Sequence, residues 1–100
     1  MAMTEARKIL DQLHVEWSIN SLGHLERVFL VKNFSEALQL ANRLGDIAIQ
    51  QAHHPDFLVC YDKLKAEIWS HKVDGLTRAD FVLAAKFDQA VDQEDNVNHV

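Results

Sequence analysis

The stretch His53-His54-Pro55-Asp56, near the middle of the chain, separates a long segment of helical periodicity from a strand-like run. Proline lacks a backbone N–H and restricts the residue before it, so a helix that reaches this stretch ends there. Histidine is the residue type best suited to proton transfer near neutral pH, and here two stand side by side. The stretch therefore marks a structural boundary and a candidate site. A polar turn with two solvated histidines would have the same sequence pattern and is the alternative interpretation.

Residues 34–52 are predicted to form the helix that this stretch ends. Asn33 is a favourable N-cap, and Glu36 three residues later fits a capping-box-like start. One apolar stripe consists of Phe34, Ala37, Leu38, Ala41, Leu44, Ala48 and Ala52, and a second, at an angle to it, of Leu40, Leu44 and Ile47. A helix resting on one sheet needs a single stripe, so we favour an oligomer surface for the second over a wide core contact.

Short strand-like runs flank this helix on both sides. Residues 17–19 and 25–32 alternate around the turn Asn20-Ser21-Leu22-Gly23 and predict a hairpin. Residues 57–61 and 64–69 predict a second pair of strands. A tight turn at Asp62-Lys63 joins them, or else they form one long strand with a bend.

Helices are also predicted at both ends of the chain. Apolar residues recur at helical spacing in residues 4–14, and Thr77 with Asp80 forms a T-x-x-D box that starts a helix reaching about Asp92. The polar tail, residues 93–100, is expected to fray. Together the segments predict one α+β domain, residues 1–100 with a core of about 4–92, in which helices pack on one face of a four-stranded antiparallel sheet.

Composition excludes several classes of function. The net charge of −5 and the lack of any basic run argue against direct nucleic-acid binding. No apolar stretch approaches the roughly 20 residues that span a bilayer, and the N-terminus does not read as a signal peptide. Cys60 is the single cysteine of the sequence, so a reducing cytoplasm is the expected location. It lies in an apolar run and is interpreted as a packing residue.

The titratable residues of the second strand pair are expected to converge. His53 and His54 precede its first strand and His71 follows its second, and an antiparallel hairpin brings its entry and exit to the same end. Asp80, one helical turn into the last helix, could reach back to His71, or could serve only to cap its helix. A carboxylate bonded to one imidazole nitrogen fixes the tautomer and raises the basicity of the other.

This set of side chains indicates proton-transfer chemistry. Three histidines and an aspartate could instead hold a divalent metal, but adjacent histidines on an extended segment point to opposite sides and grip one ion poorly. No nucleophile elbow, phosphate-cradling glycine loop or dinucleotide fingerprint is present. The accessible reactions are dehydration, hydration or isomerisation of a small molecule.

The spacing of these residues resembles the signature of the pterin-4a-carbinolamine dehydratases. Five residues separate Pro55 from Tyr61, nine separate Tyr61 from His71, and eight separate His71 from Asp80. Gly23-x-Leu25-x-Arg27-x-Phe29, Phe34-x-x-Ala37-Leu38 and His71-x-x-x-Gly75-Leu76-Thr77-x-x-Asp80 also resemble the family, so the likeness runs from about Trp17 to Asp88.

The resemblance implies dehydration of 4a-hydroxytetrahydropterin to the quinonoid dihydropterin, in recycling of the cofactor of aromatic amino acid hydroxylases. It implies acid–base roles for His53 and His71, binding and orientation by His54, and support of His71 by Asp80. Pro55, Tyr61 and Trp69 are the expected substrate-binding residues. No metal or organic cofactor is implied, and the expected assembly is a homodimer or homotetramer formed through residues 34–52 and the sheet edges.

One position departs from the family pattern. Ile49 stands four residues before His53, where the family usually carries an acidic or other polar residue, so His53 is expected to lack a carboxylate from its own helix. Relatives with altered sites serve as interaction partners, so a non-catalytic dimeric interaction module on the same fold is the alternative function.

Overall fold

The computed structural model describes residues 1–98, and the side chains of residues 1–92. The predicted order of helices and strands is confirmed. The helices are α1 (Met3–Leu10), α2 (Phe34–Gln50) and α3 (Arg78–Asn98), and the strands are β1 (Ser18–Ile19), β2 (Leu25–Leu30), β3 (Asp56–Val59) and β4 (Lys63–Ile68). No helix of the described part of the chain is long and apolar enough to cross a membrane.

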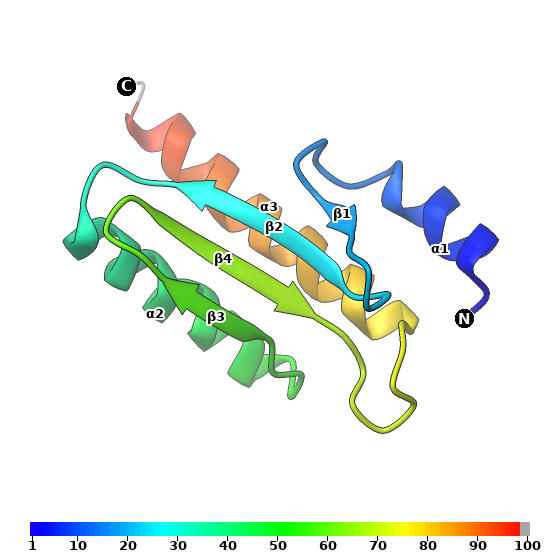
Figure 1. Cartoon of the computed structure of the whole chain (residues 1–100). Helices are drawn as coiled ribbons and strands as arrows, with labels where there is room; N and C mark the ends of the chain where they lie inside the picture. The colour runs from blue at the N-terminus through cyan, green and yellow to red at the C-terminus, as the bar shows by residue number, and fades with distance from the viewer. Residues whose placement is uncertain (99–100) are drawn as a thin grey trace.

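The four strands form one antiparallel sheet in the order β1-β2-β4-β3. The central strands β2 and β4 pair along six residues each, with Leu25 opposite Ile68 and Leu30 opposite Lys63. The helices α2 and α3 lie side by side behind this sheet, and α1 lies beyond β1 (Figure 1). The α+β architecture with helices on one face is therefore confirmed.

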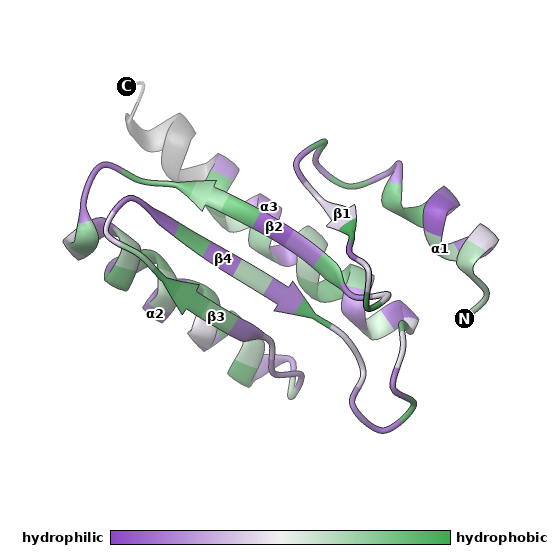
Figure 2. Ribbon diagram, viewed as in Figure 1, coloured by the Kyte–Doolittle hydropathy of each residue, from purple (hydrophilic) through white to green (hydrophobic). Residues whose placement is uncertain are grey.

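Alternation along the central strands separates the core from the opposite face of the sheet. Figure 2 shows hydrophobic and hydrophilic residues alternating along β4. Leu25 and Phe29 of β2 and Leu64, Ala66 and Ile68 of β4 are buried against the helices. The intervening residues Glu26, Val28, Lys65 and Glu67 define what we call the outer face, which no helix covers.

The second apolar stripe of α2 belongs to the core, so its interpretation as an oligomer surface was wrong. Leu44 is fully buried, Leu40 is 8% exposed, and Ile47 packs against the same cluster. The helix lies across two neighbours, the sheet and α3, and therefore buries a wider arc than a sheet alone requires. The exposed large apolar side chains of α2 are instead Phe34, Leu38 and Ile49.

Two predicted helix ends also differ, and the predicted hairpin of the second strand pair is confirmed. The first helix ends at Leu10, because residues 11–13 continue as a turn. The second strand pair is a true hairpin, closed by the hydrogen bond from Cys60 N to Lys63 O, so the single bent strand is excluded. The last helix continues to Asn98, so its predicted end at about Asp92 is wrong, while residues 99 and 100 lie outside the described part.

Candidate active site

The C-terminal end of α2 sets the position of His53. Ala52 has φ of 52°, a left-handed conformation, and its N–H bonds to the carbonyl of Ile49 while the N–H of His53 bonds to that of Ala48. These two bonds form a Schellman motif, which ends the helix and turns the chain sharply. The chain then passes through His54 and Pro55 into β3. Both histidines are thereby held at one end of the sheet.

The Asp80 carboxylate lies in the first turn of α3 and is fully buried. Its Oδ2 accepts hydrogen bonds from the Thr77 backbone N–H at 2.7 Å and from the Ser70 hydroxyl at 3.0 Å. The bond from Thr77 confirms the predicted box, and the helix N-terminus favours the negative charge there. One oxygen is therefore committed to the local structure, which leaves Oδ1 for another partner.

That partner is His53, whose Nε2 hydrogen-bonds to Oδ1 of Asp80. The prediction that Asp80 holds His71 is therefore wrong, and the prediction that it serves only as a cap is incomplete. The physical reason is alternation along residues 69–71, which turns Ser70 toward α3 and His71 away from it. With Nε2–H donated to Asp80, the imidazole presents Nδ1 as its acceptor.

Ile49 does not weaken this arrangement in the way the sequence suggested. Its side chain is 68% exposed, and His53 lies beyond the end of the helix rather than on the turn above Ile49. The carboxylate that supports His53 comes from a different helix. The departure from the family pattern at position 49 therefore leaves the His53–Asp80 pair intact.

His71 is supported by aromatic rings instead of a carboxylate. Its imidazole stacks on Trp69 at 4.2 Å between ring centroids, and Trp69 stacks on His24 at 4.1 Å. The Nδ1 of His24 lies 2.6 Å from the carboxylate of Glu67, and this hydrogen bond lowers the pKa of Glu67 below its usual range. Sequence reasoning missed His24 and Glu67, as well as Ser70.

One cleft of about 690 Å³ brings the predicted histidines together. It lies between the end of α2, the start of β3 and the loop before α3, and its lining includes His53, His54, Pro55, Asp56, Ser70 and His71. The convergence predicted from hairpin geometry is thus confirmed. Within residues 1–92, whose side chains are described, no group of three or more His, Cys, Asp or Glu side chains is placed to hold a metal ion.

Two of the predicted substrate-binding residues do not line this cleft. Tyr61 lies in the turn between β3 and β4, at the opposite end of the hairpin, and is 74% exposed. A six-residue strand is about 20 Å long, so Tyr61 is remote from the histidines of its own chain. Trp69 contacts the cleft through His71, on which it stacks. Pro55 does line it.

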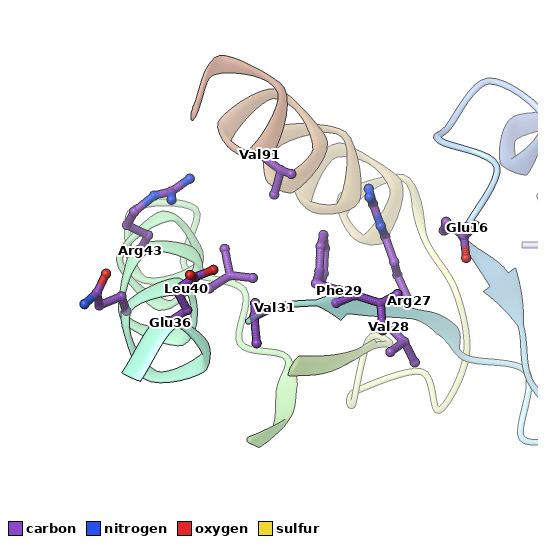
Figure 3. A pocket seen from close by; sticks show the side chains of 11 residues that line it. Glu16, Arg27, Val28, Phe29, Val31, Glu36, Leu40, Arg43 and Val91 are labelled. Carbon is purple, nitrogen blue, oxygen red and sulfur yellow. The ribbon is translucent and has the colours of Figure 1, made fainter. Parts of the chain in front are cut away.

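A second hollow, of about 400 Å³, lies between β2, α2 and α3 (Figure 3). Its lining includes two arginines, both engaged within the chain: Arg27 pairs with Asp88, and Arg43 donates to the carbonyl of Ala90. None of the predicted site residues lines it. The histidine cleft is therefore the candidate active site.

Comparison with known proteins shows which family the chain resembles. Residues 1–90 match the profile of the family described as pterin 4 alpha carbinolamine dehydratase. A candidate pterin-4-alpha-carbinolamine dehydratase from Alkaliphilus metalliredigens (strain QYMF) is 44% identical over 89 residues, which cover 89% of this chain and 80% of the relative. A candidate enzyme of the same name from Rickettsia canadensis (strain McKiel) is 42% identical over 87% of this chain and 80% of its own length.

A solved structure shares the fold. The crystal structure of a transcriptional coactivator/pterin dehydratase from Brucella melitensis superposes with a TM-score of 0.80, covering 89% of this chain and 95% of that one at 23% identity. The match over residues 1–90 and the relatives above 40% identity decide the assignment. The chain belongs to the pterin-4a-carbinolamine dehydratase family.

Proposed function

We propose that the protein dehydrates 4a-hydroxytetrahydropterin to the quinonoid dihydropterin and water by histidine acid–base catalysis, in the recycling of tetrahydropterin. The observation that carries the proposal is the convergence of His53, His54 and His71 in one cleft, with His53 bonded to a buried carboxylate. Family membership supports a dehydratase, a hydro-lyase acting on a pterin, and the cleft supports the assignment of its residues.

The reaction needs two proton transfers. A ring N–H of the pterin gives up its proton, its electrons form the new C=N bond, and the bond from C4a to the hydroxyl breaks as that hydroxyl takes a proton and leaves as water. His53 is suited to the first step, because Asp80 fixes its tautomer with Nδ1 free and stabilises the imidazolium that forms. His71, across the cleft, is suited to deliver the second proton.

The remaining residues have binding roles in this proposal. His54 is exposed within the cleft and is placed to bind and orient the pterin, and Pro55 provides a rigid wall beside it. Trp69 acts through His71. A role for Tyr61 requires that it reach the cleft of another copy of the chain, because it lies at the far end of its own hairpin.

The direct test is the rate of loss of the 4a-carbinolamine absorbance with and without purified protein. We expect acceleration over buffer, and we expect His53→Ala and His71→Ala each to lower kcat/KM by about 100- to 10,000-fold, the usual contribution of a general acid or base. His14→Ala is the matched control, since His14 is exposed in the α1–β1 connection, away from the cleft. Folded protein that does not exceed the buffer rate would exclude the enzyme.

A homodimer or homotetramer is also part of the proposal. The exposed Phe34 and Leu38 near the start of α2, and Ile49 near its end, provide an apolar surface, and β3 is an unpaired edge of the sheet. Light scattering on the purified protein measures the assembly. We expect Leu38→Asp to shift it toward monomer, while Gln39→Asp, which adds the same charge at an exposed position about 100° round the helix from Leu38, leaves it unchanged.

The same exposed surface is the observation that favours a second function, a non-catalytic interaction module. The structural relative from Brucella melitensis is named both a coactivator and a dehydratase. This alternative predicts a complex with another protein that survives His71→Ala and is lost in Leu38→Asp. A pure scaffold has no physical reason to bury Asp80 against His53, so we favour the enzyme.

A further inference from the structure

We infer that Trp69 and His24 are positioning residues for His71: the three rings form a column that fixes the plane of the His71 imidazole at the cleft. The inference rests on the proposed function for the role of His71, and on the geometry of the column for everything else.

The stacking is close and nearly parallel. The rings of His24 and Trp69 are 4.1 Å apart and inclined by 3°, and those of Trp69 and His71 are 4.2 Å apart and inclined by 20°. The column runs from His24, which is 7% exposed, through the partly buried Trp69 to the exposed His71. Offset stacking of planar rings restrains both their separation and their tilt.

His71 depends on this contact because its own surroundings are otherwise open. It lies in a surface loop whose ends are joined at Ser70 and Gly75, and it is exposed. Among the side chains of residues 1–92, none hydrogen-bonds to its imidazole, so Trp69 is the contact that orients it. An exposed imidazole without such a contact exchanges rotamers within nanoseconds.

His24, at the buried end of the column, is held in place by hydrogen bonds. The Nδ1 of His24 bonds to Oε2 of Glu67, and the same oxygen accepts from Nδ2 of Asn20 at 3.1 Å. The Oδ1 of Asn20 in turn accepts the backbone N–H of His24. Glu26 faces this group as well, bonded to Asn20 and paired with Lys65. His24 is therefore fixed in both position and ring plane.

Strand register explains why these three rings meet. Leu25 pairs with Ile68, so the next pair toward the cleft places His24 opposite Trp69. Both lie on the same side of the sheet as Glu67, which is diagonal to His24. His71, two residues beyond Trp69, returns to that side and completes the column.

Kinetics and thermal stability distinguish a column that positions His71 from one that only stabilises this end of the hairpin. If it positions His71, its loss lowers kcat more than it raises KM, because a misplaced acid is felt in the transition state. If it is only structural, its loss lowers the melting temperature and leaves the kinetics of the folded fraction unchanged. Ring-current shifts of the His71 protons report the stacking without any reference to activity.

The experiment compares Trp69→Leu, Trp69→Phe and His24→Ala with the wild-type protein, and uses Val28→Ala as a control that changes the outer face away from the column and its polar contacts. We expect Trp69→Leu to lower kcat by about 10- to 100-fold with KM changed by less than about threefold, the size of effect that second-layer partners have. We expect Trp69→Phe to restore most of the rate, His24→Ala to have an intermediate effect, and Val28→Ala to have none.

The second measurement is the NMR spectrum of the imidazole protons. In the wild type we expect the His71 Cε1–H resonance to be shifted upfield by the Trp69 ring, and to return to the position of a free imidazole in Trp69→Leu. An unshifted resonance in the wild type overturns the column, and so does a kcat that Trp69→Leu leaves unchanged in an active enzyme. If the wild type has no dehydratase activity, the proposed function fails while the NMR result still decides the column.

Discussion

The imidazole of His53 and the carboxylate of Asp80, 27 residues apart in the sequence, are joined by a hydrogen bond between Nε2 and Oδ1. This bond links the segment that follows α2 to the first turn of α3. The same carboxylate holds Thr77 and Ser70, so one buried side chain joins the cap of a helix, a loop and a candidate catalytic residue.

Replacing this carboxylate separates its chemical role from its structural role. We expect Asp80→Asn to lower kcat/KM by about 10- to 100-fold, since an amide supports the wrong tautomer and does not stabilise an imidazolium. We expect Asp80→Ala to lower the free energy of unfolding as well, by about 1–3 kcal/mol, because buried donors lose their acceptor. Steady-state kinetics and urea unfolding measure the two effects. Ser70→Ala, which removes one donor only, should retain most of the activity.

The buried pair of Arg27 and Asp88 is expected to be a large single contribution to stability. Asp88 accepts from the Arg27 guanidinium, the Trp17 indole at 2.8 Å and the His14 backbone N–H at 3.2 Å. We expect Asp88→Asn to destabilise the protein by about 3–5 kcal/mol, because it leaves a buried cation unpaired. Thermal and urea unfolding test this, with Asp92→Asn, at an exposed site one turn along α3, as the control. A loss below about 1 kcal/mol would contradict it.

The left-handed residue at the end of α2 offers a stabilising substitution. Ala52 has φ of 52°, where a side chain is strained, so we expect Ala52→Gly to raise the free energy of unfolding by about 0.5–1 kcal/mol. Gly23 is the matched reverse case. Its φ is 80° and a Cβ there would meet no atom within 4 Å, so Gly23→Ala should cost about 1 kcal/mol through backbone strain alone. Urea unfolding of both variants should give opposite signs.

The pH dependence of stability should carry a contribution from Glu67. The hydrogen bond from His24 lowers the pKa of Glu67 in the folded protein below the value of 4.5 that it has without such contacts. At pH values between the two, the unfolded chain binds more protons, so stability rises with pH there. The contribution is complete above about pH 4.5 and is lost as the pH falls through the folded pKa. As the pH is lowered from 6 to 3, the free energy of unfolding should fall less steeply for Glu67→Gln than for the wild type.

Local patterns were sufficient to predict the order of helices and strands, because period and capping are properties of short segments. Asn33 does accept from the backbone N–H of Glu36, and Asp80 from that of Thr77, as their spacing predicted. The second stripe of α2 was misread because its neighbour is α3, which is distant in the sequence, and no local pattern reports which helices become adjacent. The length of α3 was underestimated because a polar sequence can remain helical when its first turns are packed.

The sequence predicted which histidines meet at the site, but not which hydrogen bonds the site residues form. Hairpin geometry alone brought His53, His54 and His71 to one end of the sheet. The partner of Asp80 depends instead on which way Ser70 and His71 face, and that is fixed by the register of β4 against β2. The same register, extended by one pair, places His24 beside Trp69, and this pairing of β2 with β4 is not a local pattern of the sequence.

The alternation at residues 69–71 has a consequence for how the chain can vary in length. Surface loops ordinarily accept insertions and deletions, and the loop before α3 would be the natural place for one. A single residue added between Ile68 and Ser70 would reverse the sides on which the following side chains lie. The His71 ring would then face α3, and the Ser70 hydroxyl would face the outer face. Length changes are therefore expected only beyond His71, which makes the first half of this loop as constrained as a strand.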